Sequence, residues 1–373
     1  MYRILHVVNS MDIGGTETVL MNLYRRLDYS KFQFDFVVHV THECAYESEI
    51  DSLGGRVIRT NKYFVKNYLS YSRWWRDFLA EHPEYPIVHG HQGSTAPVCL
   101  HEANRAGRIS IAHSHATRDS QRNLRTLLWE LNSLPTRFVA QQFLACSEEA
   151  GVDRFGHKIV SSPRFHIMKN GIDVARFAFN HDARKRLREE FGAGEDCFVV
   201  GHVGRFSVPK NHAWLLRVFK AVLAIQPNAM LLLIGQGDLE NAIRSQANNM
   251  GIASRVRFLG AHTDVETFYS AMDAFCFPSL SEGLGMVAVE AQVSGLPVIA
   301  SEAVPMLADI GAGLFERLSL NENAEAWAKA LLEHIRKPRN LHAAQVARDV
   351  GYDISDVAEW LQSYYWDLIE LHR

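Results

Sequence analysis

Short apolar segments alternate with longer amphipathic stretches along most of this 373-residue chain. The short segments are rich in β-branched and aromatic residues, as buried strands are, and the longer stretches have the apolar spacing of helices. This alternation is typical of an α/β fold with parallel sheets. The predicted strands form two series, the first at residues 4–8, 34–40, 56–59, 87–89, 109–112, 143–145 and 165–168 and the second at residues 198–203, 230–234, 256–259, 274–277 and 297–300.

A linker separates the two series. Asn170-Gly171 is typical turn chemistry, and a polar, helix-prone stretch follows it, so we place the boundary within residues 170–181. The pattern predicts two doubly wound domains, residues 1–175 and 176–353. Ligands of such sheets bind outside the carboxyl ends of the strands, so we expect the site at a cleft between the domains. Residues 353–373 carry an apolar stripe at helical spacing, which predicts a final helix packed on another element.

Composition excludes several classes of protein. With 39 basic and 42 acidic side chains, the chain has no overall positive field to attract nucleic acid. Residues 1–180 carry 21 basic and 18 acidic side chains, and residues 181–373 carry 18 and 24. This asymmetry fits either an anionic partner for the first half or ordinary solvated surface.

The five scattered cysteines argue against a disulfide framework or zinc cluster. Lacking a signal peptide or apolar span, the protein is expected in the cytoplasm.

The most specific pattern is PSLSEGLGMVAVEAQ at residues 278–292, directly after a predicted strand. Gly283 and Gly285 let the backbone approach a ligand, and the helix predicted after them offers free amide groups to a phosphate. The carboxylates of Glu282 and Glu290 are suited to accept hydrogen bonds from sugar or ribose hydroxyls. The alternative is that Glu282 only favours the helix N-terminus electrostatically and that Glu290 is a surface residue.

Two further loops follow strands of the second series. In GRFSVPKN, residues 204–211, the cations Arg205 and Lys210 could clamp a diphosphate and neutralise it as a leaving group. The alternative is that Arg205 and Lys210 are solvated, as loop arginines and lysines usually are. The loop containing Gly235 fits either a contact with the base or diphosphate or a simple tight turn.

In the first series, Gly14 and Gly15 follow the first strand without the G-x-G-x-x-G spacing of nicotinamide-binding domains. His113 and His115 end a predicted strand on the side of the expected cleft. Two histidines could suggest a metal, but no third ligand has motif spacing, so we predict no metal.

In this order the segments resemble retaining glycosyltransferases of family 4, which have the GT-B fold, and in particular bacterial exopolysaccharide and capsular polysaccharide glycosyltransferases. The segments that carry the resemblance are GGTE (14–17), HSHAT (113–117), ACSEEAG (145–151), NGID (170–173), VGRFSVPKN (203–211), LLIGQGD (232–238), RVRFLG (255–260) and the motif beginning at Pro278.

The resemblance implies roles for individual residues. Glu290 would bind the ribose of a nucleotide-sugar donor, Glu282 the donor sugar, and Arg205 with Lys210 the diphosphate. His115 would line the reacting sugar. Further donor contacts are implied for Gly14, Gly15, Gly204, Gly235, Arg257, Gly283, Leu284, Gly285 and Met286. The last helix, about residues 354–373, would fold back onto the N-terminal, acceptor-binding domain. Ser281 stands where many members carry an aromatic residue, so the donor sugar stays open.

The resulting prediction is transfer of a hexosyl unit from a nucleoside-diphosphate sugar, with UDP favoured, to a glycan or lipid-linked saccharide during cell-surface polysaccharide synthesis. We expect retention at the anomeric carbon without metal or cofactor. Double displacement would need a carboxylate nucleophile, and no sequence feature nominates one. Alternatives are a nucleotide-sugar epimerase of the same architecture and a non-catalytic sugar-nucleotide-binding protein. The glycine spacing disfavours a nicotinamide oxidoreductase.

Two aromatic and basic segments, residues 73–76 and 118–137, raise the question of membrane contact. They fit a peripheral surface for an anionic lipid carrier at the inner face of the cell membrane, or ordinary amphipathic core helices. Both interpretations stay open at the level of sequence.

Overall fold

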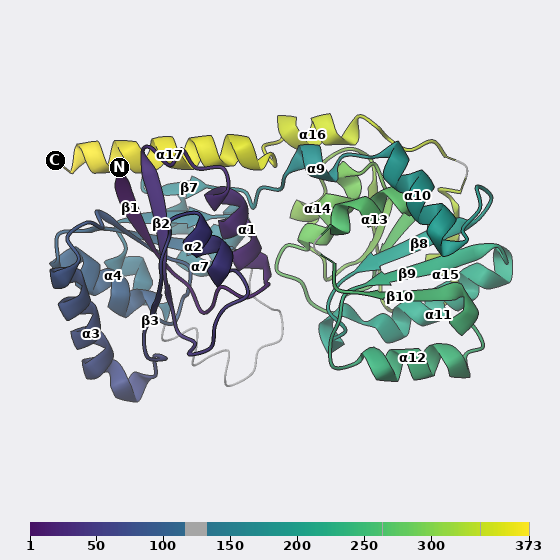
Figure 1. Cartoon of the computed structure of the whole chain (residues 1–373), viewed down its shortest axis with the longest axis horizontal. Helices are drawn as coiled ribbons and strands as arrows, with labels where there is room; N and C mark the ends of the chain where they lie inside the picture. Colours follow the sequence, from purple (N-terminus) through teal and green to yellow (C-terminus); the bar gives the residue numbers. More distant parts are fainter. Residues whose placement is uncertain (116–132, 263, 336, 373) are drawn as a thin grey trace. The chain divides into compact units, whose positions relative to one another are not determined.

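The computed structural model describes residues 1–115, 133–262, 264–335 and 337–372. Its internal contacts divide the chain into two compact units (Figure 1). Unit 1 comprises Met1–Ile172 together with Gly351–Arg373, and unit 2 comprises Asp173–Val350. Both boundaries between the units, after residues 172 and 350, lie three residues before those expected from the sequence, after residues 175 and 353.

Unit 1 is built on a seven-stranded parallel sheet with the order β3-β2-β1-β4-β5-β6-β7. The order reverses between β1 and β4, which makes the sheet doubly wound. Its strands are β1 (Tyr2–Val7), β2 (Phe32–Val38), β3 (Val57–Arg59), β4 (Ile87–Gly90), β5 (Ile109–Ser114), β6 (Gln142–Ala145) and β7 (Phe165–Ile167). Its described helices are α1 (Gly15–Tyr24), α2 (Glu47–Ser52), η1 (Val65–Asn67), α3 (Tyr68–Glu81), α4 (Ala96–Arg105), α6 (Thr136–Val139), α7 (Glu148–Phe155), α8 (His157–Val160) and α17 (Ile354–Leu371).

The last helix, α17, completes the core of unit 1 (Figure 1). Its apolar stripe is buried against residues of α1, β1 and β2, as the expected packing on the N-terminal domain requires. Asp353 begins the helix by accepting a hydrogen bond from the Ser355 amide at 2.9 Å. Near its other end, Tyr365 is fully buried and its hydroxyl lies 2.6 Å from His89 Nδ1. The helix is thus part of the unit formed by residues more than 180 positions earlier.

Unit 2 has a six-stranded parallel sheet with the order β10-β9-β8-β11-β12-β13. Its strands are β8 (Phe198–Val203), β9 (Ala229–Ile234), β10 (Val256–Gly260), β11 (Ala274–Phe277), β12 (Val298–Ser301) and β13 (Phe315–Leu318). The predicted α/β fold class with two doubly wound domains is therefore confirmed. Sequence patterning missed β13, an edge strand whose Glu316 and Arg317 face solvent and break the apolar pattern.

The helices of unit 2 alternate with its strands, apart from α9 and α10, which precede the first strand. They are α9 (Val174–Phe177), α10 (His181–Phe191), η2 (Val208–Lys210), α11 (His212–Ile225), α12 (Glu240–Asn249), η3 (Ala253–Arg255), α13 (Val265–Ala271), α14 (Met286–Val293), η4 (Met306–Ala308), α15 (Ala324–Leu332) and α16 (Ala343–Asp349). The ends of α10 are well defined, because Asn180 caps its first turn and Gly192 ends it in the left-handed conformation, with a φ of 69°.

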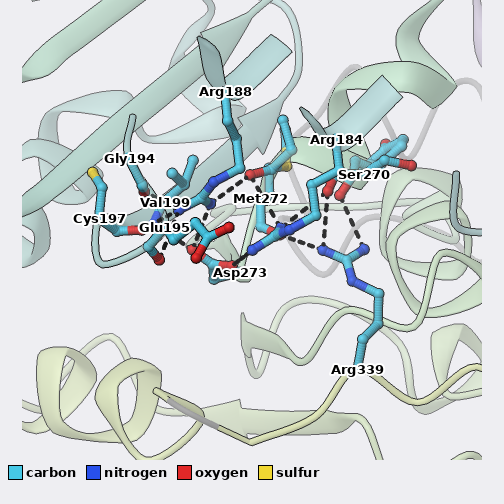
Figure 2. A network of polar contacts seen from close by, with 12 residues as sticks. Arg184, Arg188, Gly194, Glu195, Cys197, Val199, Ser270, Met272, Asp273 and Arg339 are labelled. Atoms are coloured by element: carbon cyan, nitrogen blue, oxygen red, sulfur yellow. Dashed lines mark hydrogen bonds and ion pairs between the residues drawn. The ribbon is translucent and has the colours of Figure 1, made fainter. Parts of the chain in front are cut away.

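A buried arginine network supports the amino ends of the unit 2 strands (Figure 2). Arg184 and Arg188 each bind one oxygen of Asp273, at 2.6 and 3.0 Å. Arg339 reaches the same region, where burial and the two other arginines lower its pKa to about 9. Apart from a bond from Arg339 to the Ser294 hydroxyl, the other guanidinium bonds go to backbone carbonyl groups, including those of Tyr269, Ser270, Ala271, Met272, Gly194 and Cys197. Because several of these carbonyls end α13, the arginines cap that helix.

The segment at residues 73–76 lies in α3 and is largely a packing segment. Trp75 is fully buried, and Trp74 stacks on Phe78 with ring centroids 5.0 Å apart. Of the two interpretations left open by the sequence, the burial of Trp75 favours the amphipathic core helix for this segment. Of the other segment, residues 118–132 lie outside the described part of the chain. No described helix is long and apolar enough to cross a membrane.

Candidate functional site

The loops after β8 and β11 meet at the carboxyl edge of the unit 2 sheet. These strands are neighbours at the point where the strand order reverses, the usual ligand position in such sheets. The Leu280 amide donates to the Pro209 carbonyl at 2.7 Å, and the Asn211 side-chain amide donates to the Pro278 carbonyl at 3.1 Å. The structure therefore brings together the two motifs that the sequence singled out.

The loop after β9 joins the same edge through two glycines. Gly235 has a φ of 138°, and a Cβ atom added to it would collide with the carbonyl oxygen of Gly204. The Gly235 amide donates to Gly260 at 2.7 Å, and the Gly204 amide donates to Ile234 at 2.9 Å. Only glycine permits this close backbone approach. We call the group formed by Gly204, Arg205, Lys210, Gly235 and residues 282–290 the carboxyl-edge site.

Lys210 and Glu282 form an ion pair within this site. The Lys210 ammonium lies 2.6 Å from Glu282 Oε1, and the Ser279 hydroxyl donates to the same oxygen at 2.7 Å. The ammonium also lies over the Phe277 ring, 5.1 Å from its centroid. The resemblance assigned these two residues to different parts of a ligand. The structure instead pairs them, so a ligand that uses both must share or open the pair.

Arg205 differs from Lys210 in having no such partner. Its side chain is exposed, and no described residue forms a hydrogen bond or an ion pair with its guanidinium group. Arg205 is therefore ready to bind an anion without giving up an internal contact, and its planar fork matches phosphate oxygens.

The helix α14 begins at this edge without a side-chain cap. Gly285 precedes it with a φ of 78°, and an added Cβ would lie 3.0 Å from Phe277 Cε1. The first helical turn follows at Met286. A helix N-terminus that no side chain caps is an anion-binding position. Leu284 is buried, so it would meet a ligand only through its backbone.

Glu290 lies further along α14 and is held from inside unit 2. The hydroxyl group of Tyr269, itself fully buried, donates to Glu290 Oε2 at 2.7 Å. Burial raises the pKa of Glu290 to about 7, although the Tyr269 hydrogen bond and nearby Arg176 and Lys210 oppose this. The alternative interpretation of Glu290 as a plain surface residue is therefore wrong.

Arg257 is the one predicted contact in unit 2 that lies away from this group. It is the second residue of β10 and pairs in register with Leu232, whereas the strand meets the site region at its last residue, Gly260. Its guanidinium group donates to the Ser254 carbonyl at 2.9 Å, before the strand. The sequence motif located the correct strand but not its carboxyl end.

A cavity of about 960 Å³ lies at the opposite, amino edge of the same sheet. Arg184, Asp273 and Arg339 line it, and their charged groups already bind one another or backbone carbonyls. None of the residues predicted to bind a ligand lines this cavity. Its size alone does not outweigh the chemistry gathered at the carboxyl edge.

In unit 1, Gly14 and Gly15 lie where the chain enters the first helix. Gly14 is the extended N-cap residue of α1, and the helix starts at Gly15. No side chain caps α1. A Cβ atom on Gly14 would collide with the Glu17 carboxylate, so the glycine permits this arrangement.

His115 follows β5 and is held by hydrogen bonds at both ring nitrogens. Asn170 donates from Nδ2 to the His115 carbonyl at 3.1 Å, which leaves Asn170 Oδ1 to accept from His115 Nδ1, also at 3.1 Å. His115 Nε2 then accepts from His91 Nδ1 at 2.7 Å. A sugar hydroxyl could reach a ring nitrogen only by displacing one of these partners.

His115 belongs to a cluster of five histidines that sequence reasoning recognised only in part. His6, His89, His91, His113 and His115 project on one face at the carboxyl ends of β1, β4 and β5. Burial lowers the pKa of His6 to about 3 and of His115 to about 4, and it lowers the pKa values of the others well below the usual range. The cluster is neutral at pH 7. The available signal was the His-x-His pattern at two neighbouring strand ends.

Comparison with known proteins agrees with this division of the chain. Residues 13–176 match the family described as Glycosyltransferase Family 4, and residues 183–348 match the family described as Glycosyl transferases group 1. The first match covers most of unit 1 and the second covers most of unit 2.

Individual relatives extend the match over the whole chain. The putative glycosyltransferase EpsF of Bacillus subtilis is 35% identical over 359 residues, which is 94% of this chain and 93% of EpsF. An Escherichia coli UDP-Gal:alpha-D-GlcNAc-diphosphoundecaprenol alpha-1,3-galactosyltransferase is 24% identical over 60% of this chain and 59% of its own length.

Among solved structures, HepE of Anabaena in complex with UDP has a TM-score of 0.80 at 18% identity. The similarity covers 98% of this chain and all of HepE, and it shows a shared fold. Together with the extent of the similarity to EpsF, it shows that the chain belongs to the glycosyltransferases with the GT-B fold.

Proposed function

We propose that this protein is a retaining hexosyltransferase that uses a nucleoside-diphosphate sugar, with UDP favoured, and acts without a metal. Its acceptor would be a hydroxyl of a glycan or lipid-linked saccharide in cell-surface polysaccharide synthesis. The observation that carries the proposal is a convergence at one sheet edge of the Lys210–Glu282 pair, Arg205 and the start of α14, the last two having no side-chain partner among the described residues.

The carboxyl-edge site supplies complementary groups for each part of such a donor. Arg205 and the first amide groups of α14 suit the diphosphate. Glu290, whose second role is to accept from Tyr269, has a further oxygen for ribose hydroxyls. Glu282 suits the donor sugar once Lys210 turns toward the phosphate. Polar groups with these separate tasks explain why two carboxylates lie on either side of one helix start.

The choice of UDP rests on relatives. HepE was solved with UDP and with UDP-glucose, and the Escherichia coli relative is named for transfer from UDP-Gal. The same relative's name includes a diphosphoundecaprenol-linked acceptor, which supports a lipid-linked saccharide here.

In the proposed reaction the acceptor oxygen attacks the anomeric carbon on the face from which the nucleoside diphosphate departs. The bond from that carbon to the phosphate oxygen breaks, and the departing phosphate takes the acceptor proton. Arg205 and Lys210 would stabilise the negative charge that grows on the leaving group. Alignment of the hydroxyl supplies the other part of the rate.

A panel of UDP-, GDP- and ADP-hexoses tests the proposal. We expect one nucleotide class to raise the melting temperature of the protein and to be hydrolysed slowly without acceptor. With a saccharide acceptor, proton NMR of the first-formed product should show the anomeric configuration of the donor. An inverted product would contradict retention. An isomerised sugar nucleotide without transfer would support the epimerase instead.

Peripheral membrane contact at the inner face of the cell membrane is a separate part of the proposal. Exposed apolar side chains gather at the start of α3, namely Phe64, Val65, Tyr68 and Leu69, with Lys62 and Lys66 beside them. Apolar residues flanked by lysines suit an anionic lipid surface. We expect flotation with vesicles containing anionic phosphatidylglycerol, weakened in Leu69→Asp and unchanged in the control Glu81→Gln at the far end of α3. Equal flotation with neutral vesicles would contradict it.

A further inference from the structure

Several ring nitrogens of the histidine cluster are buried and form no hydrogen bond with any described residue. His113 is only 4% exposed, and neither of its ring nitrogens has a hydrogen-bond partner among the residues that the structure describes. Leaving a buried polar atom without a partner is costly, so native proteins usually provide water, an ion or another group there. A histidine with two such atoms, in the middle of four others, calls for a ligand.

The register of β4 and β5 explains how His91, His113 and His115 come together. Gly90 pairs with Ala112, so His91 and His113 are the next residues on neighbouring strands, and His115 projects on the same face as His113. The rings of His113 and His115 stack with centroids 3.9 Å apart. One nitrogen from each of His91, His113 and His115 lies within 4.8 Å of the other two.

We propose that His91, His113 and His115 bind one divalent transition-metal ion, for which Zn²⁺ is the best fit. Zinc commonly takes three histidines and leaves a fourth tetrahedral position for water. Bonds of 2.0–2.1 Å in that geometry set the ligand nitrogens about 3.4 Å apart. His91 Nδ1 and His115 Nε2 now lie 2.7 Å apart, so these two rings must separate slightly to hold one ion. Three neutral nitrogen ligands without a carboxylate disfavour Mg²⁺ and Ca²⁺.

Two features around the three histidines support this assignment. Asn170 fixes the Nδ1 proton of His115 and so presents Nε2 to the other two rings, as outer partners of metal-binding histidines do. His91 also lines a cavity of about 350 Å³ together with Asn9, Gln92 and Thr95. The cavity thus reaches one of the three proposed ligands, His91.

A second group, His6, His89 and His91, meets the same distance criterion and shares His91. It is the weaker choice because His89 Nδ1 is held by Tyr365 and both His6 and His89 are at most 1% exposed. We therefore expect one ion in the histidine cluster, on the side of His113 and His115.

A bound ion would replace the hydrogen bond between His91 and His115 and occupy His115 Nε2. The ring proton of His91 would then move from Nδ1 to Nε2, and that of His6 from Nδ1 to its own Nε2, so that His6 Nδ1 accepts from His91. Zinc should therefore inhibit transfer, a consequence that rests on the proposed function. Binding itself does not depend on catalysis. A protein that binds zinc but transfers no sugar would overturn the proposed function and leave the metal site standing.

The test is a titration of the metal-free full chain with Zn²⁺ in competition with a chromophoric chelator. We expect one tight equivalent, and a loss of affinity of at least about 100-fold in His113→Gln and His91→Gln, above the 10- to 100-fold typical of outer-shell changes. His101→Gln, on the exposed surface of α4, and His89→Gln, in the other group, serve as controls and should bind as the wild type does. Circular dichroism would confirm that each variant is folded.

X-ray absorption of the zinc-loaded wild-type chain provides a measurement without substitution, and it should show three imidazole ligands. Absence of stoichiometric binding by the folded wild-type chain would overturn the proposal. Wild-type affinity in His113→Gln would also overturn it, as would a loss confined to His89→Gln, which would move the ion to the other group.

Discussion

At the residue scale, Arg205 and Lys210 show how two cations on one loop acquire different tasks. Lys210 is neutralised by Glu282 in a largely buried pair, with side-chain exposures of 21% and 9%. Arg205 is exposed and has no partner among the described residues. Removing one partner of a buried ion pair leaves the other uncompensated, whereas an exposed residue can be replaced with little effect on stability.

This difference predicts that replacing the two residues affects stability differently but turnover in the same direction. Lys210→Ala should lower the free energy of unfolding of unit 2 by about 1–3 kcal/mol, because Glu282 loses its partner. Arg205→Ala should change it by less than about 0.5 kcal/mol. Both should lower kcat more than they weaken donor binding. Urea unfolding and steady-state kinetics check this, and unchanged turnover in Arg205→Ala would contradict the leaving-group role.

Glu290 gives a prediction for pH dependence. Its pKa is about 7 in the folded chain against 4.5 for an ordinary glutamate, so between these pH values the folded chain holds a proton that the unfolded chain has lost. The contribution of this group to stability therefore falls as pH rises from 4.5 to 7. Glu290→Gln stays neutral and should unfold at higher urea than the wild type at pH 8, by up to about 3 kcal/mol.

The stability difference should disappear near pH 4.5, and donor affinity of Glu290→Gln should be lower because the carboxylate is lost. The exposed Glu322→Gln is the control and should show no pH-dependent difference. A Glu290→Gln variant that is less stable than the wild type at pH 8 would show that the carboxylate is not destabilised by its surroundings.

At the element scale, the carboxyl-edge site depends on how closely strand-to-helix loops approach one another. The loops after β8 and β9 touch backbone to backbone at Gly204 and Gly235, and the loop after β11 is bonded to the loop after β8. The site is therefore a property of three adjoining loops on neighbouring strands. A change at one contact should disturb the positions of groups on the others.

Alanine substitutions at two glycines with positive φ distinguish the energetic cost of crowding from the cost of backbone strain. Gly235 faces the Gly204 carbonyl, whereas Gly251, with a φ of 72°, has open space where a Cβ would lie. Gly251→Ala should cost about 1 kcal/mol from strain alone. Gly235→Ala should cost more than about 2 kcal/mol and should also weaken donor binding. Chemical denaturation and thermal-shift titration with the donor nucleotide measure both effects; equal costs would show that the loops are free to separate.

At the scale of the whole molecule, the chain returns to its first unit in its last residues. The stripe on α17 fills a core to which α1, α2, β1, β2, β4, β5 and β6 also contribute, so unit 1 is incomplete until α17 has been synthesised. Unit 2, by contrast, is continuous in sequence. A substitution in α17 should therefore lower the stability of unit 1 and leave the stability of unit 2 unchanged.

Leu361→Ala tests this dependence. Leu361 is 1% exposed, and truncating a buried leucine to alanine costs about 2–5 kcal/mol. We expect unit 1 to unfold at lower urea while unit 2 is unaffected. Hydrogen exchange followed by mass spectrometry assigns the loss to each unit, with the exposed Glu359→Ala as control. Loss of protection in residues 173–350 alone would contradict the assignment of α17 to unit 1.

The sequence by itself determined the two parallel α/β units, the loops that carry the site and the apolar face of the last helix. These features depend on local periodicity, and strand-end motifs of a parallel sheet must lie at one edge. It missed β13, because an edge strand with charged residues lacks an apolar pattern. Only the tertiary structure decided that Lys210 pairs with Glu282, that Arg257 lies away from the strand end and that five histidines share one face. Those outcomes depend on strand order, register and side-chain direction, which bring together residues up to about a hundred positions apart and leave no local signal.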